Sequence, residues 1–344
     1  MVYNFFMDNK RYFEIDALRG LAILAMILIH TNAYFLKNNI ANWLWDFSEW
    51  AVPVFIFCSA YVYFKRSPLI KNPSDLFTYV KKRFIRLLRP YYLFAAIYLL
   101  ISLLKDQRNL SIDFIISTLT AFGGTLDINW LVLLFLTFAF LMPVIHFLAA
   151  KKKWWFYGFF LLSFLSSLVF IFYSFPANYR LIMWLPWSLL IFLSWLLIKN
   201  ENGDRFLIGG AVVSLGLFFI FRQIKIYFHQ SLIQYNNKYP PNFYHLIYGI
   251  LFIFIIYFLA KKGVFNFKPV KILLVFLSRY SYPLYFVHYL IIYILTVIWQ
   301  RHFSGWVSFF LWVFIGSLVI QATINASQRY ITDRRFGYWP APAD

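Results

Sequence analysis

The sequence predicts an all-α polytopic membrane protein, a bundle of about ten transmembrane helices, and three observations support this. Of its 344 residues, 62% are hydrophobic and only 13% are charged, against roughly 25% charged residues in an ordinary soluble domain. Its apolar runs approach the roughly 20 residues that a helix needs to cross a bilayer. The runs lack the alternation of barrel strands, and backbone groups in lipid must be satisfied within the segment. Soluble enzyme folds are therefore excluded.

Ten apolar segments follow one another along the chain, and each is expected to form one membrane-spanning helix. They cover residues 17–36, 48–64, 90–104, 129–148, 154–175, 181–198, 206–221, 243–260, 280–299 and 306–326. The first is longer than a signal-peptide core and no small-residue cleavage site follows it, so we expect it to be retained. Without an internal repeat or an appended soluble domain, residues 1–344 are expected to form a single membrane domain.

The 32 Lys and Arg residues outnumber the 13 Asp and Glu residues, giving a net charge of +19. In a soluble chain this would suggest nucleic acid, but here the basic residues cluster between apolar runs, so no nucleic-acid partner is expected. With a cytoplasmic N-terminus, 23 of them fall in inside segments and 8 in outside segments. The positive-inside rule then predicts that both termini are cytoplasmic. The protein is expected to reside in the plasma or inner membrane. The single cysteine, Cys58, provides no thiolate metal site, and no metal is expected.

The first segment carries Asp16, Arg19 and His30, which are unusual in a membrane span. At 100° per residue, Arg19 and His30 lie about 20° apart and Asp16 about 60° from Arg19, so all three share one helix face. His30 is expected roughly 16 Å deeper than Arg19. Ionisable residues at that depth normally face a cavity or a partner. The alternative is an interfacial Asp16–Arg19 pair and a histidine that only hydrogen-bonds another helix.

The second segment has Glu49 near its outer end, where the residue is either functional or merely interfacial. The third is entered through Arg83, Arg86 and Arg89, spaced three residues apart. Three guanidinium groups on one ridge can hold a polyphosphate, because each binds phosphate oxygens through a planar fork of donors. Topology signalling or contact with anionic lipids explains the same run equally well.

The ninth segment contains Ser281, Tyr285 and His288 at positions i, i+4 and i+7. They form a polar stripe on an otherwise apolar helix, which is expected to face protein or water. Structural hydrogen bonding between helices is the alternative. His288 is expected nearer the cytoplasmic side than His30, with only hydroxyl groups beside it on the stripe.

These residues resemble the integral membrane acyltransferase family known as acyltransferase-3, which opens with an acidic residue, Leu-Arg-Gly and a histidine eleven residues after the arginine. The opening is matched by Glu14, Asp16, Leu18, Arg19, Gly20 and His30. Further matches are Val52-Pro53-x-Phe55 leading to Ser59-Ala60-Tyr61, Arg83-x-x-Arg86 before Pro90-Tyr91, Trp130 ahead of Pro143, and Tyr282-x-Leu284-Tyr285-x-x-His288. The family commonly has Ser-Gly-Tyr at residues 59–61 and often Pro-Pro at 89–90. The second departure leaves open whether Arg83 and Arg86 or Arg86 and Arg89 form the family's arginine pair.

The resemblance implies an enzyme that moves an acyl group, most often acetyl, from cytoplasmic acyl-CoA to a sugar hydroxyl of an envelope glycan or its lipid-linked precursor. His30 would act as general base, Arg19 would bind the donor or position the helix, and Asp16 would orient Arg19. The arginine run would hold the CoA phosphates, while Glu49, Trp130, Ser281, Tyr285 and His288 would support the site. Direct transfer and a route through an acyl-histidine both fit.

Two other functions fit an intramembrane histidine that shares a face with an acid and an arginine. A proton-coupled transporter or flippase of a glycan intermediate could use these groups as a relay. A non-catalytic subunit of glycan machinery is the third possibility. Transporters often show inverted repeats and broken spans in matching positions, and the sequence shows neither.

Overall fold

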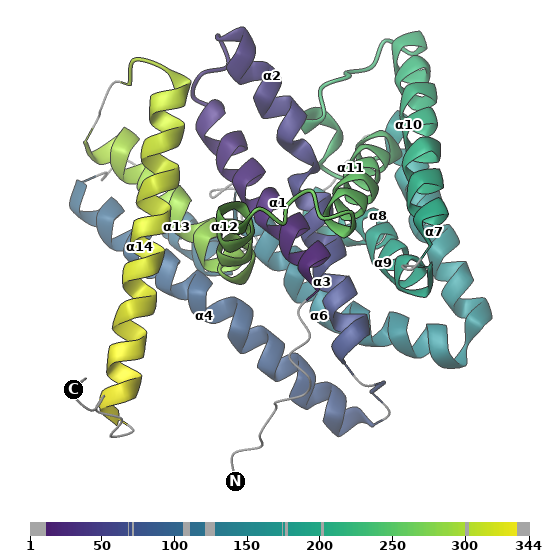
Figure 1. Ribbon diagram of the computed structural model, residues 1–344, viewed down its shortest axis with the longest axis horizontal. Coiled ribbons are helices and arrows are strands. Elements are labelled where there is room, and N and C mark those ends of the chain that lie inside the picture. The colour runs from purple at the N-terminus through teal and green to yellow at the C-terminus, as the bar shows by residue number, and fades with distance from the viewer. Residues whose placement is uncertain are drawn as a thin grey trace.

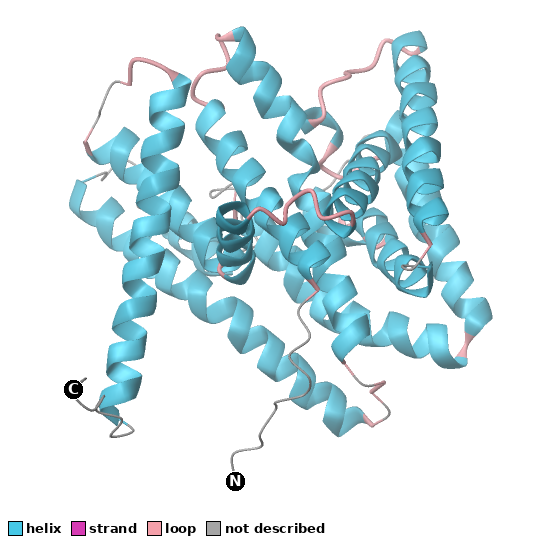
Figure 2. Cartoon of the chain, in the orientation of Figure 1, coloured by secondary structure: helices cyan, strands magenta, loops and turns pink. Residues whose placement is uncertain are grey.

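The computed structural model describes residues 12–335 apart from 68, 71, 106–110, 121–127, 174, 176–177, 201–202 and 300–302. The described residues contain helices, short turns and loops but no strand, which confirms the predicted all-α class (Figure 2). The one β-type feature among them is an isolated bridge between Lys238 and Pro241.

The helices follow one another with short connections (Figure 1). They are α1 (Phe13–Asn32), α2 (Asn39–Phe47), α3 (Ala51–Arg66), α4 (Pro73–Lys105), α5 (Ile112–Thr120), α6 (Asn129–Lys151), α7 (Lys153–Phe172), α8 (Trp184–Trp187), α9 (Leu189–Asn200), α10 (Asp204–Tyr227), α11 (Phe243–Lys261), α12 (Lys268–Arg279), α13 (Ser281–Tyr293) and α14 (Trp306–Arg335). Short 3₁₀ turns cover Ser48–Trp50, Tyr179–Leu181 and Tyr235–Asn237, and a π-helical turn, Ile294–Ile298, continues α13.

Eight helical segments of the described chain are long and apolar enough to cross a membrane, so the chain is a multi-pass membrane protein. They are Asn39–Arg66, Pro73–Leu104, Asn129–Lys151, Lys153–Phe172, Asp204–Tyr227, Phe243–Lys261, Ser281–Ile298 and Trp306–Gln328. The two other predicted spans, 17–36 and 181–198, fall on α1 and on the shorter apolar helix Trp184–Asn200. The number of spans, ten, stays a prediction.

Helix α1 forms the centre of the bundle and contacts α2, α3, α11, α12, α13 and α14. It packs tightly against α12 at Gly20, where a Cβ atom would lie only 2.6 Å from the backbone oxygen of Leu274. The glycine after Arg19 is therefore required by helix packing, because no side chain fits between the two backbones. This packing brings the end of α12, and hence the start of α13, against α1.

Asparagine side chains cap the N-termini of α2 and α11. Asn38 accepts hydrogen bonds from the backbone N–H groups of Ile40 and Ala41, and Asn242 accepts one from the N–H of His245. Such N-caps satisfy donors that have no partner within the helix. They fix the residues at which α2 and α11 begin.

The beginning of α4 and the end of α14 lie at the lower edge of Figure 1, whereas α2 and the segment between α10 and α11 lie at the upper edge. The sequence assigns the first two to the cytoplasm and the last two to the outside, so segments predicted on one side are found together. Of the basic residues counted for that prediction, Lys10, Arg11, Lys71, Arg108 and Arg301 lie outside the described residues. The orientation in the cell stays a prediction.

Candidate functional site

Two histidines from the most widely separated motifs meet inside the bundle. His30, near the end of α1, and His288, on α13, place Nδ1 and Nε2 respectively 2.7 Å apart, with the two rings nearly parallel at 5°. His288 is fully buried, whereas His30 is partly exposed. The pair joins the first and last motifs of the chain into one site.

The predicted separation of His288 from His30 is wrong, because the two side chains meet, whereas the neighbours of His288 on its own stripe are the hydroxyl residues Ser281 and Tyr285. That prediction counted residues from an expected interface near residue 280. The close packing of α12 on α1 instead sets Ser278 against Asp16, where the Ser278 hydroxyl donates to Oδ1 at 2.7 Å. Helix α13 thus begins beside the first turns of α1, and ten residues after Ser278 the side chain of His288 meets that of His30.

The hydrogen bonds of the pair define which nitrogen can act as a base. His288 Nδ1 lies 2.8 Å from the carbonyl oxygen of Leu284, and a carbonyl only accepts, so Nδ1 carries the proton. In a neutral ring, His288 Nε2 then has the lone pair and accepts from His30 Nδ1–H. The remaining nitrogen, His30 Nε2, keeps its lone pair. The arrangement therefore presents His30 Nε2 as a proton acceptor.

Tyr285 and Ser281 lie with His288 on the buried side of α13. The Tyr285 ring lies near both imidazoles, with centroid distances of 6.3 Å to His30 and 5.9 Å to His288. Its hydroxyl donates to the carbonyl oxygen of Ile128 at 2.9 Å, and Ser281 is 8% exposed. The stripe thus faces protein, and Tyr285 connects the histidines to the start of α6, where Trp130 is located.

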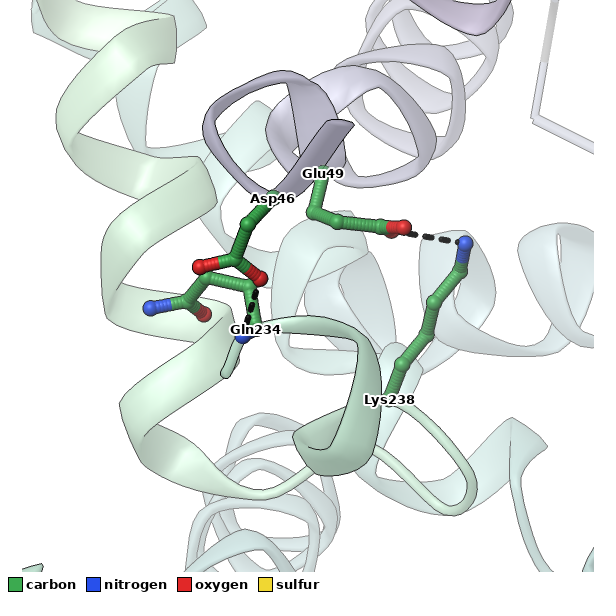
Figure 3. Close-up of polar contacts among 4 residues, drawn as sticks. All are labelled: Asp46, Glu49, Gln234 and Lys238. Atoms are coloured by element: carbon green, nitrogen blue, oxygen red, sulfur yellow. Dashed lines mark hydrogen bonds and ion pairs between the residues drawn. The ribbon is translucent and has the colours of Figure 1, made fainter. Parts of the chain in front are cut away.

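Glu49 is enclosed by protein rather than exposed at the surface. It belongs to the 3₁₀ turn Ser48–Trp50, is completely buried, and forms an ion pair of 2.8 Å with Lys238 (Figure 3). Nearby, Asp46 accepts a hydrogen bond from the backbone N–H of Gln234 at 2.6 Å, also drawn in Figure 3. Both carboxylates therefore fasten the segment between α10 and α11 to the α2–α3 corner.

Lys238 is a site residue that the sequence analysis counted only as an outside charge. Its ammonium lies 5.5 Å from the ring centroid of Trp130, 5.9 Å from that of Tyr235 and 5.3 Å from that of Tyr239, and such contacts stabilise a desolvated cation. Lys238 also acts electrostatically on His30. Burial, and next the Glu49 carboxylate, raise the pKa of Tyr239 well above its ordinary value, so its phenol stays protonated. The signal in the sequence was a lysine beside aromatic residues, YNNKYPP, in the longest outer segment.

Asp16 and Arg19 lie one to two turns into α1, away from the histidines along the same helix. Asp16 accepts from Ser278 as described, and Arg19 Nη2 donates to the carbonyl oxygen of Cys58 at 3.3 Å. Eleven residues of helix separate Arg19 from His30, which corresponds to about 16 Å. Arg19 therefore belongs to a second region, closer to the arginines of α4.

The three arginines of α4 differ in their surroundings. Arg83 Nη2 donates to Ser59 Oγ at 2.7 Å, and the electrostatic neighbours of its guanidinium include Tyr79, Arg86, Arg19 and Tyr282. Arg86 and Arg89 are exposed, and Arg89 lines an apolar groove along α4 with Phe140. Arg83 thus has Arg86 and Arg19 as electrostatic neighbours, whereas Arg89 faces the groove. Such a cationic group suits an anionic ligand such as a phosphate.

Nothing in the described part of the chain resembles a metal centre, since no three His, Cys, Asp or Glu side chains there are placed to hold one ion. The site instead consists of a histidine pair, a buried ion pair and an arginine group joined along α1.

The comparisons with known proteins agree with the resemblance seen in the motifs. A family model described as an acyltransferase domain matches residues 12–324, nearly the whole chain. No curated protein and no solved structure shows a significant match. The family match supports acyl transfer rather than transport or a purely structural role. This chain is a membrane-embedded protein that belongs to the acyltransferase-3 family.

Proposed function

We propose that this protein transfers an acyl group, in the first instance acetyl, from cytoplasmic acyl-CoA to a hydroxyl of an envelope or surface glycan or its lipid-linked precursor. The observation that carries the proposal is the hydrogen-bonded pair of His30 and His288 inside a bundle of an acyltransferase family. A sugar hydroxyl is a weak nucleophile until a base removes its proton. His30 Nε2 is the group arranged to do so.

In the proposed reaction the acceptor oxygen attacks the thioester carbonyl carbon while its proton passes to His30 Nε2. The tetrahedral intermediate collapses, the carbon–sulfur bond breaks, and CoA leaves as a thiolate that takes up the proton. General-base catalysis of this kind contributes roughly 10² to 10⁴ in rate. His288 acts as a positioning residue, because its hydrogen bond keeps the proton of His30 on Nδ1.

The donor is proposed to bind with its phosphates at Arg83 and Arg86, supported by Arg19. These arginines lie together, and a planar fork of donors matches phosphate oxygens. The narrow pantetheine arm would then extend along α1, over the roughly 16 Å that separate Arg19 from His30. This arrangement favours Arg83 and Arg86 over Arg86 and Arg89 as the phosphate-binding pair.

The test uses the purified full-length protein with acetyl-CoA and a glycan extract of the source cells. Wild-type protein is expected to release CoA only when both substrates are present, and to label the glycan. His30→Ala is expected to abolish transfer while donor binding persists, because a base acts in the transition state. A folded His30→Ala protein with near-normal transfer would refute the assignment. A covalent acyl-protein that forms before acceptor is added would indicate the acyl-histidine route instead of direct transfer.

A further inference from the structure

The buried region around Lys238 contains hydrogen-bonding groups that the protein does not use. Glu49 is 0% exposed, and only one of its oxygens, Oε2, binds Lys238. The other, Oε1, has no hydrogen-bond partner among the described residues. Trp187 is also 0% exposed, and its indole N–H has no hydrogen-bond partner among the described residues either. Buried polar groups are normally satisfied, so each such group needs an explanation.

The two groups lie on either side of one aromatic cluster. Lys238, which holds Glu49, is positioned over Trp130 at 5.5 Å, and the rings of Trp130 and Trp187 stack with centroids 6.5 Å apart. The Tyr239 ring meets Trp130 edge to face at 5.0 Å. The cluster thus adjoins one charged acceptor, Glu49 Oε1, and one indole donor, Trp187 Nε1. His245, whose ring lies 5.6 Å from that of Trp187, adds two buried ring nitrogens without a partner among the described residues.

This combination has a definite chemical complement. A hydroxyl group both donates and accepts hydrogen bonds, and a ring that carries several hydroxyls can satisfy an acceptor and a donor at once. Aromatic side chains provide large rigid apolar faces with a polar edge. The ligand is expected to be uncharged, because the Glu49–Lys238 pair is already neutral overall.

We propose that Glu49 and Trp187 form the hydroxyl-binding subsite for a neutral sugar ring, next to the aromatic pair of Trp130 and Tyr239. This inference rests on the proposed function, since the ring would belong to the acyl acceptor. The subsite is connected to the base by contacts: the carbonyl of Ile128, two residues before Trp130, accepts from the Tyr285 hydroxyl, and the Tyr285 ring lies near both histidines.

Two substitutions remove one hydrogen-bonding function each. In Glu49→Gln the amide oxygen keeps the contact with Lys238, so the amide NH₂ takes the place of Oε1 and a donor replaces an acceptor. Trp187→Phe keeps an aromatic ring but removes the N–H. Matched controls are Asp46→Asn, which retains an oxygen for the Gln234 N–H, and Trp184→Phe, whose indole N–H donates to the Leu181 carbonyl elsewhere.

Binding is measured by saturation-transfer NMR on the full-length protein in nanodiscs, with methyl glucoside, methyl galactoside, methyl mannoside and N-acetylglucosamine as probes. Wild-type protein and both controls are expected to bind at least one probe. Affinity should fall about 10- to 100-fold in Glu49→Gln, the range for a hydrogen bond to a charged group, and at least fivefold in Trp187→Phe. Wild-type protein that binds none of the probes, or a change below fivefold in either variant, would overturn the inference.

Acetyl-CoA consumption on the same preparations separates this inference from the proposed function. Sugar binding that depends on Glu49 and Trp187, without any release of CoA from wild-type protein in the presence of glycan, would refute the transferase proposal and leave the subsite intact. Release of CoA by wild-type protein, with probe affinities unchanged in both variants, would refute the subsite and leave the transferase proposal intact. If Glu49→Gln does not fold, the affinity of Trp187→Phe alone decides whether the subsite exists, because this substitution leaves the charges of the site unchanged.

Discussion

Replacing His288 by alanine is expected to slow acyl transfer without weakening donor binding. The substitution removes the acceptor of the 2.7 Å hydrogen bond from His30 Nδ1. A donor left without its partner in a buried site costs about 1–3 kcal/mol, which corresponds to roughly a 5- to 150-fold lower rate if the productive state bears that cost. Activity should nevertheless remain measurable, because the base itself is still present.

The measurement is the turnover number and the Michaelis constant for acetyl-CoA, determined from CoA release with glycan present. His288→Gln should recover most of the loss, since the amide oxygen can occupy the place of Nε2 and accept from His30. His146→Ala is the matched control: this partly exposed histidine packs against Tyr63 and Phe64, away from the pair, and its loss should leave the turnover number unchanged.

Two results would refute the reasoning about His288. Equal turnover in wild-type and folded His288→Ala protein would show that His30 needs no positioning partner. Equal defects in His288→Ala and His288→Gln, with an increased Michaelis constant for acetyl-CoA, would instead indicate a role of the residue in donor binding or packing.

Three further predictions concern the donor site, the packing of α1 and the topology. Arg86→Lys should weaken acyl-CoA binding by about tenfold, because a point charge replaces a bidentate fork of donors. The control Lys82→Ala should leave acyl-CoA binding unchanged. Unchanged affinity in both Arg83→Ala and Arg86→Ala would mean that these arginines only determine the topology. Gly20→Ala should destabilise the protein by about 1–3 kcal/mol in thermal unfolding, because the added Cβ would lie 2.6 Å from the Leu274 backbone. The control Gly158→Ala, whose Cβ would have nothing within 4 Å, should leave the stability unchanged. Equal stability of the Gly20→Ala and wild-type proteins would contradict this packing. A membrane-impermeant thiol reagent should modify Lys37→Cys but not Lys152→Cys in intact cells, and the opposite labelling would reverse the orientation.

Much of the fold could be predicted because the bilayer imposes a simple rule. A helix that crosses lipid needs a long apolar run, so composition and segment length alone predict an all-α membrane protein, and each predicted segment falls on a helix. The shared face of Arg19 and His30 could also be predicted, because spacing along one helix determines which residues lie on the same side. These features depend on neighbours within a few turns of the same chain segment.

The site depended on contacts that no single segment specifies. His288 was placed wrongly because its depth follows from the close packing of α12 on α1 at Gly20, a contact between residues more than 250 positions apart. Lys238 was missed because a charge in a loop resembles any solvated lysine until the loop folds onto the Glu49 carboxylate. Apolar periodicity determines which face of a helix is buried. Side-chain volume, and how closely two helix backbones can approach, decide which helix packs on that face and at what depth the two meet. For this protein, the sequence by itself determined the helices and the chemistry they carry, and the tertiary structure decided which of those groups meet.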